Sequence, residues 1–148
     1  MEHRQEGHQE LREGITAQKV VIMHGEKYLV LKRAEVKNGK PNAFPGLYDF
    51  AGGKPELDEE LEAALKREVK EETGLDVEAE GVQGVYPGQL GNTPVTFIIY
   101  AVRVLSHDVT QVQLSAEHTE SLWVTADELR GLPSMPYMES YLNDSLKT

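Results

Sequence analysis

The chain contains no cysteine, which excludes disulfide bonds, thiolate metal sites and catalysis by a thiol. It also has no run of about 18 apolar residues, the length that a helix needs to cross a bilayer. Its first fourteen residues, MEHRQEGHQELREG, are almost wholly polar and lack the apolar core of a signal peptide. From the sequence we therefore expect a cytoplasmic protein with no membrane partner.

Positive charge is scarce as well. The chain has 15 lysines and arginines against 25 aspartates and glutamates, which gives a formal net charge of −10. Binding to polymeric DNA or RNA depends on a basic face that releases counterions, so we expect no nucleic-acid polymer as a partner. A small phosphorylated ligand is compatible with this charge, because metal ions can bridge an acidic pocket and a phosphate group.

The length of 148 residues, with 39% hydrophobic residues, suits one domain with its own core. Residues 1–14 show no apolar periodicity, and we expect them to form a flexible tail ahead of a single domain over residues 15–148. Strand-like and helical patterns are mixed along the chain, which predicts an α/β fold with a mixed sheet between helices on both faces. Both a monomer and a homodimer are compatible with the sequence.

The predicted strands are short runs of β-branched and aromatic residues between turn residues. A hairpin is expected from Gln18 to Arg33, and further strands are expected over 46–53, 76–86, 93–105 and 121–124, the second of these with a bulge near Gly81. Thr125 and Glu128 form a capping box that opens a short helix. A last helix is expected to begin at Ser134.

The most informative stretch is Gly53 to Leu75, which reads GKPELDEELEAALKREVKEETGL. Its apolar residues lie three and four positions apart: Leu61, Ala64, Leu65 and Val69. This spacing predicts a helix from about Asp58 to Thr73 with these residues buried. Asp58 is expected to cap its start and Gly74 to end it in a left-handed conformation.

The second half of this predicted helix places carboxylates toward the core. On a helical wheel Glu68 and Glu72 point along the apolar stripe and Glu71 lies at its edge, whereas Glu62 lies on the exposed side. Buried carboxylates repel one another, so we expect a cation among them. Ligands that are all oxygen favour Mg²⁺ first and Mn²⁺ next. The alternative is a solvated acidic helix with no function.

The stretch as a whole resembles the signature of the Nudix hydrolases, G-x5-E-x7-R-E-U-x-E-E-x-G-U, in which U is apolar. Every fixed position is present: Gly53, Glu59, Arg67, Glu68, Val69, Glu71, Glu72, Gly74 and Leu75. The resemblance implies an α/β/α sandwich. It also implies hydrolysis of a nucleoside diphosphate linked to another group, by attack of water on phosphorus with divalent metal ions at the phosphates.

The same resemblance implies roles for individual residues. Glu68, Glu71 and Glu72 would hold the metal, and the carbonyl of Gly52 is a candidate for an additional ligand. The resemblance also implies a catalytic role for Glu71. Glu59 and Arg67 are expected to act as a pair that orients the site.

The general base of this family usually lies outside the signature, on a loop before a late strand. In this chain that position corresponds to LSAEHTESLW, and Glu117, six residues before Trp123, is our first choice. Glu120 and His118 stay open as alternatives. Two cations outside this loop are expected to contact phosphate oxygens of the substrate: Arg33 and Lys54.

A nucleoside triphosphate, oxidised or not, is the leading prediction for the substrate. Relatives that cleave ADP-ribose often carry a proline about fifteen residues past the signature. Here Pro87 and Pro94 lie twelve and nineteen residues past Leu75, so that pattern is not met. ADP-ribose or a nucleotide sugar is the next alternative. A non-catalytic Nudix domain that binds a nucleotide and regulates a partner is the rival from a different class.

Overall fold

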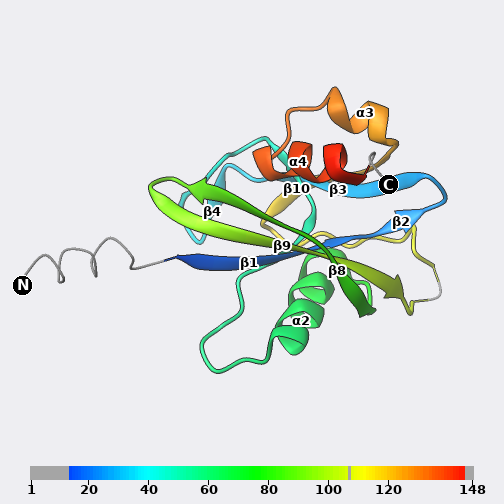
Figure 1. The fold of residues 1–148 in the computed structure, drawn as a ribbon, viewed down its shortest axis with the longest axis horizontal. Coiled ribbons are helices and arrows are strands. Elements are labelled where there is room, and N and C mark those ends of the chain that lie inside the picture. The colour runs from blue at the N-terminus through cyan, green and yellow to red at the C-terminus, as the bar shows by residue number, and fades with distance from the viewer. Residues whose placement is uncertain (1–13, 107, 146–148) are drawn as a thin grey trace, which may run out of the picture.

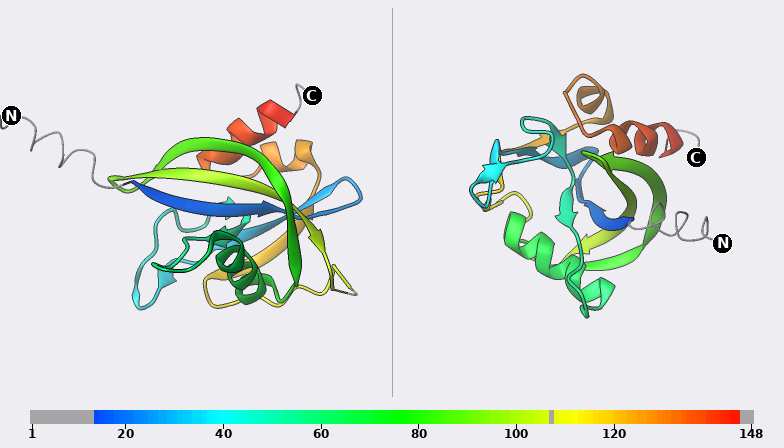
Figure 2. Two further views of the ribbon diagram at one scale, coloured as in Figure 1. Left: turned by 60° about the horizontal axis from the view of Figure 1, so that its bottom comes forward. Right: turned by 90° about the vertical axis from the view of Figure 1, so that its left-hand side faces the viewer.

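The computed structural model describes residues 14–106 and 108–145, coloured in Figure 1. The predicted tail, residues 1–14, lies outside the described residues except for Gly14, and a single domain over residues 15–148 stays a prediction. The sheets form a central layer in Figure 1, with α2 (Leu61–Thr73) below it and with α3 (Ala126–Arg130) and α4 (Pro136–Ser145) above it, and the second view of Figure 2 shows the same arrangement. The predicted α/β/α arrangement is confirmed, although the central layer consists of two main sheets.

The first sheet has four strands in the order β7-β1-β9-β8. Their bounds are Ala51–Gly53 for β7, Ile15–Val21 for β1, Thr93–Val104 for β9 and Val77–Leu90 for β8. β1 pairs in parallel with β9, whereas β7 and β8 pair with their neighbours in antiparallel fashion. The sheet is therefore mixed, as the sequence predicted, and β9 occupies its interior.

The bulge that was predicted in β8 is present, because the register shifts between Ala79 and Gly81 and again between Val82 and Gly84. The predicted end of this strand before Pro87 is wrong, since β8 continues to Leu90. β8 is the edge strand of its sheet, and an edge strand tolerates a proline that has no N–H to donate.

The second sheet has the order β10-β3-β2, and β6 also pairs with β3. The bounds are His118–Val124 for β10, Lys27–Arg33 for β3, Met23–His24 for β2 and Tyr48–Asp49 for β6. Only the short hairpin of β2 and β3 matches the hairpin predicted from Gln18 to Arg33, because β1 belongs to the first sheet. A small hairpin of β4, Val36–Lys37, and β5, Lys40–Pro41, lies within the loop that follows β3.

The helix of the signature is α2, Leu61–Thr73, and it begins three residues later than predicted. Asp58 does not cap it, since Asp58 has a left-handed φ of 73° and the N-cap position falls on Glu60. The cause is Glu59, whose carboxylate accepts hydrogen bonds from Arg67 and from the backbone N–H of Glu56. The segment before the helix follows these contacts rather than the helical path.

The buried face of α2 is nearly the predicted one. Ala64, Leu65 and Val69 are buried against the first sheet, but Leu61 is 50% exposed and does not belong to the buried stripe. Gly74 ends the helix with a φ of 77°, as predicted. The exposed face carries the expected pair of Glu62 and Lys66.

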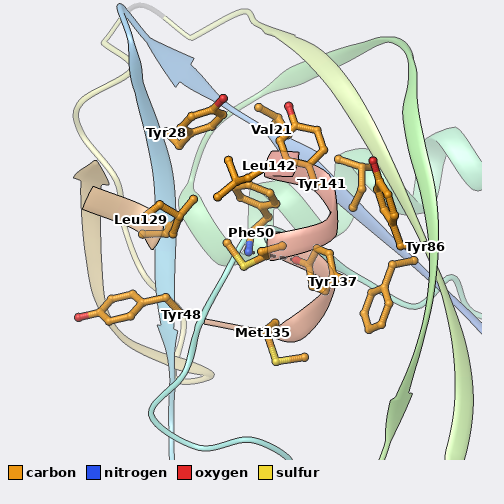
Figure 3. Close-up of a cluster of buried hydrophobic side chains, with 14 of the residues drawn as sticks. Val21, Tyr28, Tyr48, Phe50, Tyr86, Leu129, Met135, Tyr137, Tyr141 and Leu142 are labelled. Atoms are coloured by element: carbon orange, nitrogen blue, oxygen red, sulfur yellow. Dashed lines mark hydrogen bonds between the residues drawn. The ribbon is translucent and has the colours of Figure 1, made fainter. Parts of the chain in front are cut away.

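The other two helices cover the opposite side of the molecule. They are α3, Ala126–Arg130, which begins with the predicted capping box of Thr125 and Glu128, and α4, Pro136–Ser145. α4 packs an aromatic cluster against the sheets, as Figure 3 shows for Phe50, Tyr137 and Tyr141. Tyr137 stacks on Phe97 of β9 with a centroid distance of 4.3 Å. This cluster fixes the last helix relative to β9 and to the strands around Phe50.

Candidate active site

A cleft of about 830 Å³ lies between α2, β1, the loop after β3 and the segment before β10. It brings together residues that are distant in the sequence and were predicted for the site: Arg33, Gly52, Lys54, Arg67, Glu68, Glu71, Glu72 and Glu117. Among the described residues that line the cleft, two of the predicted site residues are missing: Glu59 and the alternative base Glu120.

The acidic wall of the cleft is the face of α2 that packs against the turn at Gly52 and Gly53. Glu72 is only 4% exposed, and it accepts a hydrogen bond of 3.0 Å from the backbone N–H of Gly52. A side chain on Gly53 would place its Cβ 2.6 Å from the carboxylate of Glu68, so glycine leaves room for that carboxylate. Gly52 has a φ of 142°, and a Cβ there would overlap the carbonyl oxygen of Gln18.

The electrostatics of this wall indicate a deficit of positive charge. Burial raises the pKa of Glu72 to about 8, although Lys19 acts in the opposite direction. Burial also raises the pKa of Glu68, against the effect of Arg67. An additional cation at this wall would stabilise the ionised form of both carboxylates.

Arg67 is the cation that contacts the carboxylates of Glu68 and Glu71 in the structure. Its Nη1 lies 3.2 Å from Glu68 and 3.4 Å from Glu71. Within the described residues, no three acidic or histidine side chains are gathered as closely as a bound ion would require. The donor set itself fits a hard divalent cation, because it consists of carboxylates on one face of one helix beside a backbone turn.

Glu59 and Arg67 form a two-point ion pair. The Nε of Arg67 donates to Glu59 at 2.7 Å and its Nη2 donates at 2.8 Å. Arg67 holds the pKa of Glu59 at about 2, well below its ordinary value. Since Glu59 does not line the cleft, this geometry agrees with an orienting role rather than with direct binding.

The wall beside Glu72 is built around Asp49, which the sequence reading missed. Asp49 is fully buried and accepts hydrogen bonds from Lys19 at 3.0 Å, from Arg33 at 2.9 Å and from the hydroxyl of Tyr137. Burial alone would raise the pKa of Asp49, but the charges of Lys19 and Arg33 outweigh it and hold the pKa low. Asp49 therefore fixes two cations in the wall of the cleft.

Lys19 could have been found from the sequence, because it is the one charged residue in the apolar run from Ala17 to Ile22. Arg33, predicted to contact phosphate, also donates to the carbonyl of Ala43 at 2.8 Å and to Asn42 at 3.2 Å. It thus holds the loop after β3 as well as Asp49. Lys54 is exposed at the rim of the cleft.

The three candidates for the general base occupy different environments. Glu117 lines the cleft, its Oε1 lies 3.6 Å from Lys37, and its charge raises the pKa of Glu68 across the cleft. His118 lines the cleft too, but burial lowers its pKa to about 4. Glu120 accepts a hydrogen bond from Tyr48 and is not among the described residues that line the cleft.

A model of the NUDIX domain family matches residues 16–142. The chain belongs to the Nudix hydrolase family. The match includes the whole Nudix box from Gly53 to Leu75 and the segment with Glu117. Among solved structures, a MutT protein from Methanosarcina mazei Go1 is similar, with a TM-score of 0.78 and 26% identity. The similarity covers 90% of this chain and 94% of that chain, so this chain has the Nudix fold.

Relatives of this chain are named for different substrates. A MutT-like protein of Streptomyces ambofaciens is 32% identical over 110 residues, which are 74% of this chain and 62% of that protein. The ADP-ribose pyrophosphatase of Methanocaldococcus jannaschii is 39% identical over 66 residues, or 45% of this chain and 36% of that protein. The nucleoside triphosphatase NudI of Enterobacter sp. (strain 638) is 28% identical over 120 residues, or 76% and 82%. This chain thus matches less than two thirds of the length of the first two.

None of the helices in residues 14–106 and 108–145 combines the length and the apolar character that crossing a membrane would need.

Proposed function

We propose that this chain hydrolyses a phosphoanhydride bond of a nucleoside diphosphate that is linked to another group. The observation that supports the proposal is the cleft itself, in which the carboxylates of the Nudix box lie beside the wall that carries Lys19 and Arg33. One wall can bind divalent cations and the other carries positive charge, so together they can receive a polyanion. The partner is then a small nucleotide rather than a nucleic-acid polymer.

We assign Glu68, Glu71, Glu72 and the carbonyl of Gly52 to Mg²⁺ or Mn²⁺. When bound, such a cation neutralises phosphate charge and lowers the pKa of water. Glu72 is held for this task by the N–H of Gly52, and Arg67 is held beside Glu68 and Glu71 by its ion pair with Glu59. These contacts hold the carboxylates on one side of the cleft, and a bound cation would draw them closer together.

We assign the general base to Glu117. It is the acidic candidate that lines the cleft from outside α2, and its backbone carbonyl is fixed by the N–H of Ala34 at 3.0 Å. Its carboxylate would accept the proton of the attacking water as the bond to phosphorus forms and the bond to the leaving phosphate oxygen breaks.

For the substrate we propose a nucleoside triphosphate, oxidised or not. The relative named as a nucleoside triphosphatase aligns over most of both chains, whereas the relative named as an ADP-ribose pyrophosphatase aligns over only 66 residues. The absence of the proline pattern described above also disfavours ADP-ribose. ADP-ribose and nucleotide sugars are the second candidates.

The test is a panel of nucleoside triphosphates, 8-oxo-dGTP, ADP-ribose and nucleotide sugars, each incubated with and without Mg²⁺. The products should be a nucleotide and pyrophosphate or a second phosphorylated fragment, detected by chromatography. A protein that binds members of the panel but turns none of them over would instead be the non-catalytic regulatory domain.

A further inference from the structure

The cleft continues beyond the acidic wall into an apolar half along β1. Ile15, Ala17 and Lys19 project from the same face of β1, because alternate residues of a strand share a face, and all three line the cleft. Lys19 is paired with Gly52 at the acidic end, and Ala17 is paired with Phe97 of β9. From Lys19 to Ile15 the strand spans about 13 Å and changes from charged to apolar.

The apolar half has the features of a site for a planar group. Phe97 and Met135 line it together with Leu90 and Thr93 at the far end. Phe97 is held in place by its stack on Tyr137, and Gly88 leaves space for its ring, since a Cβ there would lie 2.7 Å from it. Apolar walls with few fixed polar groups are typical of sites that bind small organic ligands.

Among the described residues that line the cleft, one buried side-chain nitrogen lacks a hydrogen-bond partner. His118 is 7% exposed and lines the cleft, yet its buried Nδ1 makes no hydrogen bond within the described residues. Its polar neighbours in the wall, Lys19, Arg33 and Asp49, are bonded to one another. A buried side-chain nitrogen without a partner costs free energy, and because such groups are rare in folded proteins this one calls for a functional explanation.

We propose that His118 is a specificity-determining residue that hydrogen-bonds to the nucleoside of the substrate when the nucleoside occupies the apolar half of the cleft. This inference rests on the proposed function, since it assumes a nucleotide whose phosphates lie at the acidic wall. Strand pairing sets His118 beside Arg33 at the start of β10, and the charged groups that act on its ring are Asp49, Lys19, Glu117 and Arg33. The proposed nucleoside would follow the phosphates from this charged end toward Ile15 and Phe97.

The chemistry of the ring agrees with recognition rather than with proton transfer. Burial lowers the pKa of His118 to about 4, so the imidazole is neutral at pH 7 and offers one donor and one acceptor. A neutral donor–acceptor pair suits the edge of a base or a sugar hydroxyl. It suits a phosphate group less well, because phosphate binding favours cationic donors.

The test measures kcat and KM of the wild type, His118→Ala and His118→Asn for the four ribonucleoside triphosphates, their 2′-deoxy forms and 8-oxo-dGTP. For the preferred nucleotide, kcat/KM of His118→Ala should fall about tenfold or more, chiefly through KM. His118→Asn, which retains hydrogen-bonding groups, should recover part of the loss. Inhibition by inorganic pyrophosphate, which has no nucleoside, should change by less than about twofold.

The pattern of loss identifies the contact. A reduced spread among bases indicates a bond to the base, and a reduced difference between ribo and deoxy forms indicates a bond to the sugar. His24→Ala is the matched control, because His24 is exposed beside Trp123 and outside the cleft, and it should change nothing. An equal loss for every nucleotide and for pyrophosphate, or no loss at all, overturns the inference.

Calorimetric binding of the nucleoside monophosphates to the same variants separates this inference from the proposed function, because it needs no turnover. If the wild type hydrolyses nothing in the panel, the proposed function fails, and the monophosphate affinities still decide the role of His118. Should His118→Ala fail to fold in a thermal melt, His118→Asn gives the same comparison.

Discussion

Replacement of Glu72 by glutamine should separate the catalytic role of this residue from its effect on stability. Glutamine keeps an oxygen that can accept the hydrogen bond from Gly52, so the turn and α2 should stay in register. It removes the negative charge that we assign to the metal. We expect turnover to fall by at least about 10²-fold while the fold is retained.

The effect on stability follows from the raised pKa of Glu72. The pKa is raised from 4.5 to about 8 by burial, so the folded, metal-free protein binds a proton that the unfolded chain releases. The contribution of protonated Glu72 to stability is fully present below pH 4.5. As the pH rises from 4.5 toward 8, the free energy of unfolding falls by about 1.4 kcal/mol per pH unit. At pH 7 the loss is on the order of 3 kcal/mol. In chelator, Glu72→Gln should therefore raise the free energy of unfolding by up to this amount, less the cost of burying the amide.

The assay is urea unfolding at several pH values between 5 and 8 in excess chelator, together with turnover in Mg²⁺. Relative to Glu72→Gln, the wild type should lose stability as the pH rises across this range, because the other titrating groups, His118 among them, are present in both proteins. Glu62→Gln is the control on the exposed face and should stay within about 0.5 kcal/mol of the wild type. Normal turnover with lowered stability in Glu72→Gln would refute the reasoning and make this carboxylate structural.

Three further outcomes are expected. Glu117→Gln should lower turnover by roughly 10²- to 10⁴-fold with Mg²⁺ affinity nearly intact. If Glu117→Gln keeps wild-type turnover at every pH and Glu120→Gln loses turnover instead, the general base is Glu120. Turnover should vanish in excess chelator and return when Mg²⁺ or Mn²⁺ is added. Ca²⁺ should restore it only weakly, because its looser coordination misplaces the attacking water. Undiminished turnover in chelator would contradict this prediction. Gly53→Ala should keep the fold and lose activity, because the added methyl group contacts the movable carboxylate of Glu68. Gly52→Ala should unfold the protein, because the added methyl group overlaps the backbone of Gln18. Equal melting temperatures of the two variants would contradict this distinction.

The Nudix box could be read from the sequence because its information is local. Helical spacing placed Glu72 on the buried face and identified Gly74 as the end of α2, and both are confirmed by the structure. The capping box of Thr125 was equally local. The early start assigned to α2 failed because the contact between Glu59 and Arg67 competes with capping by Asp58, and spacing alone does not rank such contacts.

The wall of the cleft around Asp49 could not be predicted in the same way. Asp49 meets Lys19, Arg33 and Tyr137 through strand pairing and helix packing that join positions up to 88 residues apart. Nothing in the spacing of these four residues connects them. The division of the strands into two sheets could not be predicted for the same reason. The local pattern does not show that β1 pairs with β9 rather than with the hairpin of β2 and β3.

The bond between Tyr137 and Asp49 sets an order on the assembly of the site during synthesis. Asp49 and the Nudix helix leave the ribosome long before α4, so a nascent chain can form α2 while Asp49 lacks one of its three partners. A carboxylate that is buried without its full set of hydrogen bonds costs free energy. The wall around Asp49 therefore gains its full set of contacts only when the last helix docks.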